Sequence, residues 1–351
     1  MRVALVGLGS AGFSMHLPAL AGLAGVEVAG VCDAEPARRD RASKAFRVPT
    51  YADFDTRLAA SRPGVVINGT PPDTHADFCV RAIAAGAHVL CEKPFVPTVA
   101  EADRVLQAAN AAMRQVAVHH QFREMPICRA LLDEVSRDGV DALRFVQVWQ
   151  MMDMAPWNET GWRGTMVERT LFEAGVHLLD LVMALFEETP ISVQASTSAA
   201  GQPGETADAI VLATLEFSRG RLAHITQDRM CKGPMQYFEV RADMSEASLR
   251  ASFGGRGRLS AGLHRGSKPH LRFEFGLSGL AWKERGPRRT VLARNPKAPM
   301  VEASRLVITK TLEAFRLGTE PPTSGLRARN ILAVVAACYQ SAAAGQRIAV
   351  A

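Results

Sequence analysis

Two short segments of the sequence carry side chains suited to holding a hydroxyl group and moving its proton. The first is Glu92-Lys93-Pro94, which follows an apolar stretch that ends at Cys91. Pro94 fixes its own φ angle and favours an extended conformation at Lys93. A lysine in this position can hydrogen-bond a hydroxyl group, and burial can tune its proton affinity. An ordinary Glu–Lys surface pair at a turn is the alternative interpretation.

The second segment is Glu173-Ala174-Gly175-Val176-His177, with Asp180 three positions on. Residues four apart on a helix lie about 5–6 Å apart on one face, so Glu173, His177 and Asp180 are expected to form one stripe. A histidine with a carboxylate one turn away suits proton transfer from an alcohol. Gly175 costs a helix about 1 kcal/mol relative to alanine, which the close approach of a ligand would explain. The alternative is a histidine and its salt partner on a solvated helix face.

A third segment has the pattern of a dinucleotide site. The apolar run Val3 to Val6 is followed by Gly7-Leu8-Gly9-Ser10-Ala11-Gly12 and then by a helical pattern. Gly7 permits a sharp turn, Gly9 leaves the backbone open to the phosphates, and Gly12 lets the helix lie close to the strand. The free N–H groups at the helix start then face the anion. A βαβ unit whose glycines only shorten a turn is the alternative.

An acidic residue follows the next expected strand. The stretch Val26 to Cys32 runs into Asp33, 21 positions after Gly12, where a ribose-binding acid is expected. Asp33 favours NAD, because its carboxylate binds the ribose hydroxyls and repels a 2′-phosphate. Arg38 and Arg39 are near enough in sequence to soften that preference, so NADP stays open.

The elements that position these residues fall into two groups. Up to residue 123, expected strands alternate with helices, which predicts a doubly wound parallel sheet of the Rossmann type. Ligands bind at the carboxyl ends of such strands, where the pattern places five residues: Asp33, Thr70, Glu92, Lys93 and Gln121. A helix from Asp73 to Ala85 is expected to be capped by Asp73-Thr74.

The second group has a different pattern. A helix at 127–137, a strand at 142–152 and a helix at 170–186 precede several alternating segments, the last at 270–275. They predict a large, mostly antiparallel open sheet in an α+β domain. We therefore expect domains at 1–123 and 124–351, with the last helix free to pack back on the first. The basic segments 256–272 and 285–297 are interpreted as a solvated sheet face and loops, with contact to an anionic substrate group as the alternative.

The composition is that of an ordinary globular protein. The 351 residues are 48% hydrophobic and 22% charged, and no stretch approaches the roughly 18 apolar residues of a membrane span or has the organisation of a signal peptide. Six scattered cysteines predict reduced thiols, a cytoplasmic location and no metal site. The net charge of +6 predicts no nucleic-acid partner. His119 and His120 adjoin on an expected strand and cannot chelate one ion as a pair, and His16 is expected to pack within a helix.

The sequence resembles the NAD(P)-dependent glucose–fructose oxidoreductase and inositol dehydrogenase family over essentially its whole length. The matching motifs are Gly7 to Gly12, Thr70-Pro71-Pro72-Asp73-Thr74-His75, Gly86 to Pro94, Gln121-Phe122-Arg123, Trp162-Arg163, Gly175 to Asp180 and Gly318 to Pro322. The family usually has aspartate where Glu173 stands, and often a glycine cluster where this chain has Val167-Glu168-Arg169. These departures leave a simple hexose or inositol substrate in doubt.

The resemblance implies that Lys93 and His177 lie at the nicotinamide and that Trp162-Arg163 reach toward the cofactor. It implies a sugar, a cyclitol or a derivative as substrate, and a homodimer or homotetramer that pairs through the second-domain sheet. Trp157 and Trp162 either line the substrate cleft or pin a loop. The residues expected to bind the cofactor are Gly7, Leu8, Gly9, Ser10, Ala11, Gly12, Asp33, Arg38, Thr70, Pro71, His75, Glu92, Lys93, Gln121, Trp162 and Arg163.

The resulting hypothesis is a dehydrogenase or reductase acting on a secondary alcohol or ketone. His177 takes the hydroxyl proton, Lys93 holds the oxygen, and Glu173 orients His177. One alternative is an enzyme that keeps its NAD bound and cleaves a glycoside by oxidation, elimination and re-reduction. The other is a non-catalytic dinucleotide sensor that binds a partner protein.

Overall fold

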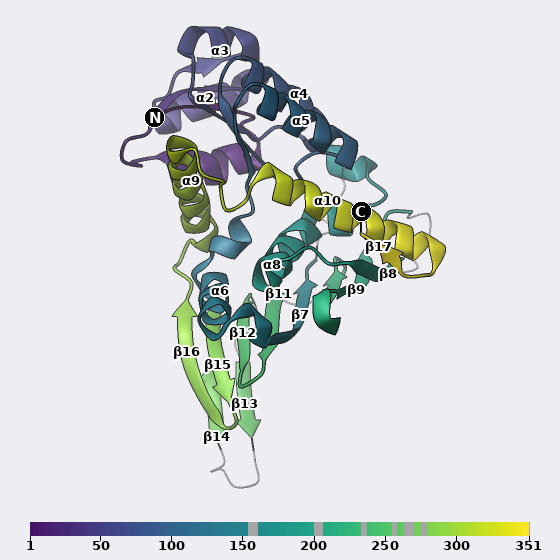
Figure 1. Ribbon diagram of the computed structural model, residues 1–351. Helices are drawn as coiled ribbons and strands as arrows, with labels where there is room; N and C mark the ends of the chain where they lie inside the picture. Colours follow the sequence, from purple (N-terminus) through teal and green to yellow (C-terminus); the bar gives the residue numbers. More distant parts are fainter. Residues whose placement is uncertain are drawn as a thin grey trace. The chain divides into compact units, whose positions relative to one another are not determined.

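The computed structural model describes residues 1–153, 161–199, 206–232, 237–254, 258–262, 270–274 and 279–350. The chain divides into two compact units (Figure 1). Unit 1 comprises Met1–Glu124 and Met300–Leu332, and unit 2 comprises Met125–Pro299 and Ala333–Ala351. Each unit is built on one large sheet.

Unit 1 contains a six-stranded parallel sheet in the order β3-β2-β1-β4-β5-β6. This order and the parallel pairing confirm the predicted Rossmann fold. Val3, Leu5 and Ile67 are at most 1% exposed, as expected for strands covered on both faces. The strands are β1 (Arg2–Val6), β2 (Glu27–Cys32), β3 (Thr50–Tyr51), β4 (Val65–Asn68), β5 (His88–Cys91) and β6 (Val116–Val118).

Helices cover this sheet, and one of them comes from far along the chain. Helix α9 contributes Val307, Ile308, Leu312 and Phe315 to the hydrophobic core of unit 1, and Figure 1 shows it beside the N-terminal segment. The helical segments are η1 (Gly12–His16), α1 (Leu17–Leu20), α2 (Pro36–Phe46), α3 (Phe54–Ser61), α4 (Pro72–Ala84), α5 (Val99–Ala111), η2 (Gln121–Glu124), α9 (Pro299–Leu317) and α10 (Gly325–Ala344), whose second half belongs to unit 2.

The start of α4 differs from the prediction. Its N-cap is Pro71, whose ring offers no hydrogen-bond acceptor, and Pro72 is the first helical residue. The predicted cap by Asp73-Thr74 is therefore wrong. Proline at the first helical position is already set to the helical φ angle, so two consecutive prolines start this helix without a polar cap.

Unit 2 contains a nine-stranded sheet in the order β16-β15-β12-β11-β7-β10-β9-β8-β17. Among the strand pairs that the structure describes here, only β7 with β10 is parallel, which confirms a mostly antiparallel sheet. The strands are β7 (Leu143–Met151), β8 (Ser192–Ser198), β9 (Ile210–Glu216), β10 (Leu222–Asp228), β11 (Tyr237–Met244), β12 (Ser248–Phe253), β15 (Leu280–Arg285), β16 (Arg288–Arg294) and β17 (Ile348–Ala349).

One prediction about this region was wrong in part. The segment expected as a strand at 270–275 is a strand, β14 (His270–Glu274), but it pairs with β13 (Arg258–Gly262) in a separate two-stranded ribbon and not in the large sheet. The basic segment 285–297, interpreted as a solvated sheet face and loops, contains the largely exposed edge strand β16, which pairs with β15. Its closely spaced arginines obscure the alternation that marks a strand, because long charged side chains can occupy either face of a sheet edge.

Helices α6 (Pro126–Asp138) and α8 (Val176–Phe186) and the π-helix η5 (Thr170–Gly175) contact strands of the unit 2 sheet. The shorter helical segments are η3 (Val140–Ala142), η4 (Gly161–Thr165) and η6 (Ser218–Gly220). Every residue from Thr170 to Phe186 is buried. This helical segment therefore lies inside the unit, and the alternative of a solvated face for His177 is wrong.

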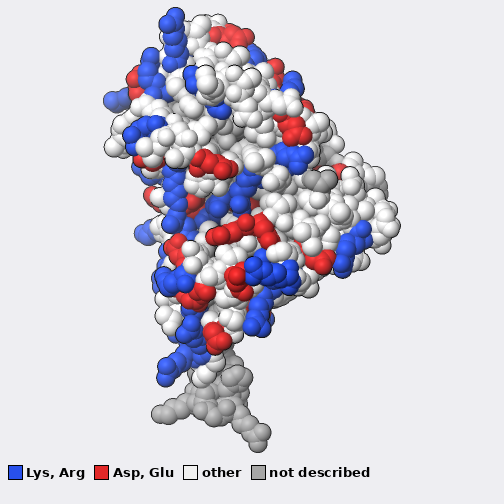
Figure 2. All heavy atoms as spheres, viewed as in Figure 1, with Lys and Arg blue, Asp and Glu red and all other residues white. Residues whose placement is uncertain are grey.

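The surface and the cysteines are those of an ordinary globular protein. Figure 2 shows basic and acidic side chains interspersed over the face in view. All six cysteines are free thiols. No helix in the described part of the chain combines the length and apolar character that a membrane crossing requires.

Candidate active site

The glycine loop of unit 1 leaves room where a pyrophosphate would lie. Gly7 has φ of +89°, and a Cβ there would lie 2.4 Å from the carbonyl oxygen of Gly69. A Cβ on Gly12 would lie 2.0 Å from the carbonyl oxygen of Gly7, so both positions require glycine. At Gly9, by contrast, the described residues place no atom within 4 Å of such a Cβ. The loop is therefore closed at its ends and open at its centre, which fits a dinucleotide phosphate.

The acid at the end of β2 is tied to this loop. One Asp33 carboxylate oxygen accepts the Leu8 N–H at 2.7 Å, and the other accepts the Glu35 N–H at 2.9 Å. The two nearby arginines differ in their contacts. Arg39 donates to the backbone oxygen of Asp33 at 2.8 Å, whereas the half-exposed Arg38 lies 3.5 Å from the carboxylate. Arg38 is thus a cation beside Asp33, the residue predicted to favour NAD over NADP.

His75 lies beneath the loops rather than at the surface. It is fully buried. Its Nε2 lies 2.7 Å from the Thr70 carbonyl oxygen, and its Nδ1 lies 2.9 Å from the carbonyl oxygens of Pro94 and Phe95. The ring therefore joins the loop after β4 to the loop after β5. Burial lowers the pKa of His75, although its carbonyl neighbours act in the opposite direction.

The other predicted residues of unit 1 are at the same sheet edge. The Thr70 hydroxyl donates to the Asn68 side chain at 2.8 Å, and Pro71 forms the N-cap of α4. Gln121 is buried, and its amide lies 3.9 Å from the Met15 sulfur. Lys93 is half-buried just after β5, and its backbone N–H donates to the Glu92 carboxylate at 3.0 Å.

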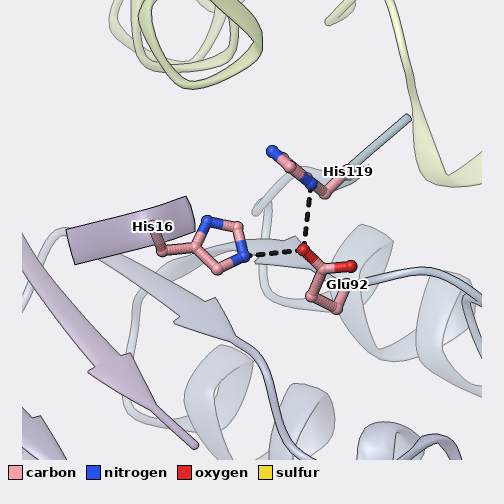
Figure 3. A group of neighbouring side chains, drawn as sticks. All are labelled: His16, Glu92 and His119. Atoms are coloured by element: carbon pink, nitrogen blue, oxygen red, sulfur yellow. Dashed lines mark hydrogen bonds and ion pairs between the residues drawn. The ribbon is translucent and has the colours of Figure 1, made fainter. Parts of the chain in front are cut away.

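A buried cluster that the sequence analysis missed joins three segments of unit 1. Figure 3 shows His16 and His119 pointing toward the same carboxylate oxygen of Glu92, at 2.7 and 2.9 Å. We call these three residues the imidazole–carboxylate cluster. His16 and His119 are fully buried, and Glu92 is 4% exposed. Glu92 and His119 follow the neighbouring strands β5 and β6, a signal in the sequence that could have paired them.

Opposing effects set the charges in this cluster. Burial would raise the pKa of Glu92, but the charge and hydrogen bonds of His119 and His16 outweigh it and hold that pKa well below its ordinary value. Burial lowers the pKa of His119. Glu92 is therefore an anion at neutral pH.

The same three side chains could offer ligand atoms to a metal ion, since these atoms lie within 4.8 Å of one another. The two distances to the Glu92 oxygen are nevertheless those of direct contacts, and the His16 contact also has hydrogen-bond geometry. Ligands held at about 2.0–2.2 Å around a tetrahedral ion stand about 3.3–3.6 Å apart. The geometry thus favours protons between these atoms, and the expected lack of a metal site stays a prediction.

In unit 2, both oxygens of Glu173 bind arginine. Arg163 Nε lies 2.5 Å from one oxygen, and Arg229 donates to the other at 2.7 Å. Glu173 and Arg229 are 5% and 1% exposed. Arg163 also lies over the Trp162 ring, 4.4 Å from its centroid. The carboxylate expected to orient His177 is therefore the centre of a buried ion-pair cluster.

His177 and Asp180 lie on the next turns of the same buried helical segment. They are 4% and 0% exposed. The segment begins as a π-helix from Thr170 to Gly175, and π-turns recur at functional sites. The wider turn means that α-helical spacing does not describe how Glu173 lies relative to His177.

The close neighbour of Gly175 is a protein side chain. A Cβ at this position would lie 2.5 Å from Gln227 Oε1 and 2.5 Å from Leu171 Cδ1. Gln227 is itself buried and donates to the Gln150 side chain at 2.8 Å. The explanation of Gly175 by an approaching ligand is therefore replaced by packing against Gln227.

The segment that stands where the family often has glycines folds onto Asp208. The Asp208 carboxylate accepts the backbone N–H groups of Arg169 and Thr170 at 2.6 and 3.0 Å, and the Tyr339 hydroxyl at 3.2 Å. Arg169 is buried. Burial and the charge of Asp208 raise the pKa of Glu168. The segment therefore places charged residues just before the start of η5. Trp157 lies outside the described residues.

The fold and the site together define an NAD-binding oxidoreductase. Residues 1–120 match the family model described as "Oxidoreductase family, NAD-binding Rossmann fold", and residues 139–250 match the GFO/IDH/MocA C-terminal domain. The chain belongs to the GFO/IDH/MocA family of oxidoreductases, which confirms the resemblance found in the sequence.

Individual relatives agree with this assignment. The chain is 26% identical to D-apiose dehydrogenase of Paraburkholderia graminis over 98% of its own length and 88% of that protein. A putative myo-inositol dehydrogenase from Sinorhizobium meliloti aligns over 100% of both chains with a TM-score of 0.80 and 21% identity. An Agrobacterium radiobacter oxidoreductase, solved with NAD+, L-tartaric acid and magnesium, covers 100% of this chain and 98% of its own, with a TM-score of 0.81 and 18% identity.

Proposed function

We propose that the protein transfers hydride between NAD and a secondary alcohol or ketone of a sugar, a cyclitol or a sugar derivative. Family membership supports the reaction class. The observation that carries the proposal is Lys93 at the carboxyl end of β5, in a sheet whose glycine loop is open at Gly9. Ligands of such sheets bind at this edge.

In unit 1, the residues that would hold the cofactor are the glycine loop, Asp33 and the segment at Thr70. When bound, the nicotinamide accepts or supplies the hydride. Asp33 is already fixed by the Leu8 N–H and favours the ribose hydroxyls of NAD. The half-exposed Arg38 beside it supports some use of NADP.

The proton is handled by side chains of the protein. In the oxidative direction, an imidazole nitrogen of His177 takes the proton of the substrate hydroxyl while its C–H bond breaks and the hydride leaves. The Lys93 ammonium holds the oxygen and stabilises the negative charge that develops on it. The burial of His177 supports this role, since a base in a low-dielectric site is shielded from competing water.

Glu173 has a revised role in this proposal. Because both of its oxygens bind arginine, it holds Arg163 and Arg229 in place and fixes the helix that carries His177. The family's aspartate is one methylene shorter. The side chain of Glu173 therefore extends its carboxylate farther from the helix, toward Arg163 and Arg229.

A substrate panel tests the proposal. Purified protein is mixed with NAD or NADP and with sugars, amino sugars, nucleotide sugars, sugar acids and cyclitols, and reduced cofactor is followed by absorbance. We expect at least one substrate to reduce NAD, and Lys93→Ala to abolish that activity. Lys44→Ala, which removes an exposed lysine of α2, is the matched control. Glycoside cleavage by tightly held NAD with no net reduction would contradict the proposal and favour the alternative.

A cytoplasmic location and a homodimer or homotetramer that pairs through the nine-stranded sheet complete the proposal. Size-exclusion chromatography with light scattering tests the assembly, and a monomer at micromolar concentration would contradict it.

A further inference from the structure

The segment that carries Lys93 is held on both sides by buried polar contacts. Before it, the imidazole–carboxylate cluster binds one Glu92 oxygen through two rings. The other Glu92 oxygen accepts the Lys93 backbone N–H at 3.0 Å. After it, His75 contacts the carbonyl oxygens of Pro94 and Phe95 at 2.9 Å. The lysine therefore extends from a backbone that is fixed at each neighbouring residue.

The cluster also joins the edge of the sheet to the glycine loop. His16 lies at the end of η1, the π-helix that follows the loop. A π-turn inserts one extra residue, and the His16 ring after this turn reaches Glu92. His119 follows β6. Three segments that form the cofactor edge thus meet at one carboxylate.

The negative charge of Glu92 needs a cation nearby, since an unpaired buried anion is strongly unfavourable. Titratable groups that act on it or lie beside it include His16, His119, His75, Cys91 and Lys93. Burial lowers the pKa of His75 and raises the pKa of Cys91, so these two carry no charge at neutral pH. His16 and His119 contact the carboxylate directly, and Lys93 follows Glu92 in the chain. The Lys93 charge is close enough to lower the pKa of His119 further.

We propose that the imidazole–carboxylate cluster positions Lys93: its two rings fix the Glu92 carboxylate against the Lys93 backbone, and that carboxylate keeps the lysine ammonium charged and in place. Glu92, His16 and His119 are positioning residues, and only Lys93 touches the substrate. The inference rests on the proposed function, in which Lys93 holds the reacting oxygen.

The test measures the ionisation of Lys93 without any substrate. The full-length protein is labelled with trace acetic anhydride from pH 5 to 11, and acetylation of the Lys93 peptide is quantified by mass spectrometry. In Glu92→Gln, the midpoint for Lys93 is expected to fall by about one pH unit or more, because the carboxylate that accepts the Lys93 backbone N–H is a neighbouring negative charge that favours the charged form of the lysine. Lys44, measured in the same digest, is the internal control and should not shift.

Two double variants separate the hydrogen bonds of the rings from their packing. His16→Gln with His119→Asn keeps a donor near each ring nitrogen, and Lys93 should then follow a single ionisation curve as in the wild type. His16→Leu with His119→Leu removes both donors, so buried Glu92 takes up a proton near neutral pH. Because Glu92 then loses its negative charge as the pH falls, the pKa of Lys93 falls as well. Lys93 should therefore be acetylated faster below pH 8 than a single ionisation curve predicts. Far-UV circular dichroism and a cooperative thermal melt confirm that each variant is folded.

An unchanged Lys93 midpoint in Glu92→Gln would overturn the inference, as would identical single curves for the two double variants. A stoichiometric divalent ion in the purified protein would also overturn it. If the leucine pair does not fold, Glu92→Gln decides alone. Failure of the substrate panel leaves these labelling curves unaffected, so the two proposals fail separately.

Discussion

Replacing Glu173 by glutamine should destabilise unit 2 strongly. The substitution keeps the shape of the side chain but removes the negative charge to which Arg229, which is 1% exposed, donates. Removing one partner of a buried ion pair costs about 3–5 kcal/mol. Arg163 contributes less, because its side chain is 37% exposed and solvent screens it. At about 2–4 °C per kcal/mol for a unit of 150–250 residues, the melting temperature of unit 2 should fall by roughly 6–20 °C.

Tryptophan fluorescence during urea unfolding is a suitable assay, since all four tryptophans lie between residues 149 and 282, in unit 2. In the Glu173→Gln/Arg229→Met double variant only the partly exposed Arg163 loses its anion, so the double variant should be at least 2 kcal/mol more stable than the sum of the single effects predicts. Glu216→Gln, which removes an anion paired with the exposed Arg347, should cost less than about 1 kcal/mol. A loss below 1 kcal/mol for Glu173→Gln, or additive effects in the double variant, would refute the buried ion-pair cluster.

Three further predictions concern unit 1. Because the pKa of His119 is lowered in the folded protein, the unfolded chain binds more protons than the folded protein below about pH 6.5. Hydrogen exchange should therefore show that unit 1 loses stability from pH 7 to pH 5 and that His119→Asn loses less. Equal losses in the two proteins would contradict the lowered pKa of His119. Arg38→Ala should raise the Michaelis constant for NADP at least tenfold more than that for NAD, and Asp33→Ala should raise the constant for NAD more than that for NADP. If steady-state kinetics show the two constants changing equally in both variants, neither residue selects the cofactor. Gly9→Ala should weaken NADH binding, measured by calorimetry, at least tenfold and leave the melting temperature within about 2 °C of the wild type. Gly12→Ala should instead lower the melting temperature. The opposite ranking of the two variants would contradict a glycine loop that is open at Gly9 and closed at Gly12.

Much of the fold could be predicted because apolar periodicity is a local property. The apolar run from Val65 to Asn68 is typical of a buried strand, and the structure has a fully buried strand there. Thr98 and Glu101 have the residue types and spacing of a capping box, and they form one at the start of α5. The position of α9 in the core of unit 1 could not be predicted in this way, since periodicity shows that a helix has an apolar face but not which sheet it covers. The bounds of β16 were not predicted within the segment interpreted as a solvated sheet face and loops, because closely spaced arginines obscure its alternation.

The candidate site shows the same limit. The glycine loop and Asp33 could be recognised because their spacing along the chain is itself the signal. The Glu173 side chain could not be placed, because its partners Arg163 and Arg229 lie 10 and 56 residues away and the π-turn changes the helical spacing. The cluster at Glu92 joins residues 76 and 27 positions apart, which only the order of the strands brings together.

The central claim is that Lys93 and His177 act on the same hydroxyl group. The most direct test measures single-turnover hydride transfer by absorbance, with a substrate found in the panel. The proteins compared are Lys93→Ala, His177→Ala and the double variant, and NADH affinity is measured in each. Each single variant should lower the rate at least about 100-fold while NADH affinity changes less than about threefold, and the double variant should be little slower than either, since residues that act as a unit are not additive. Wild-type rates in either single variant, or fully multiplicative losses in the double variant, would contradict the claim.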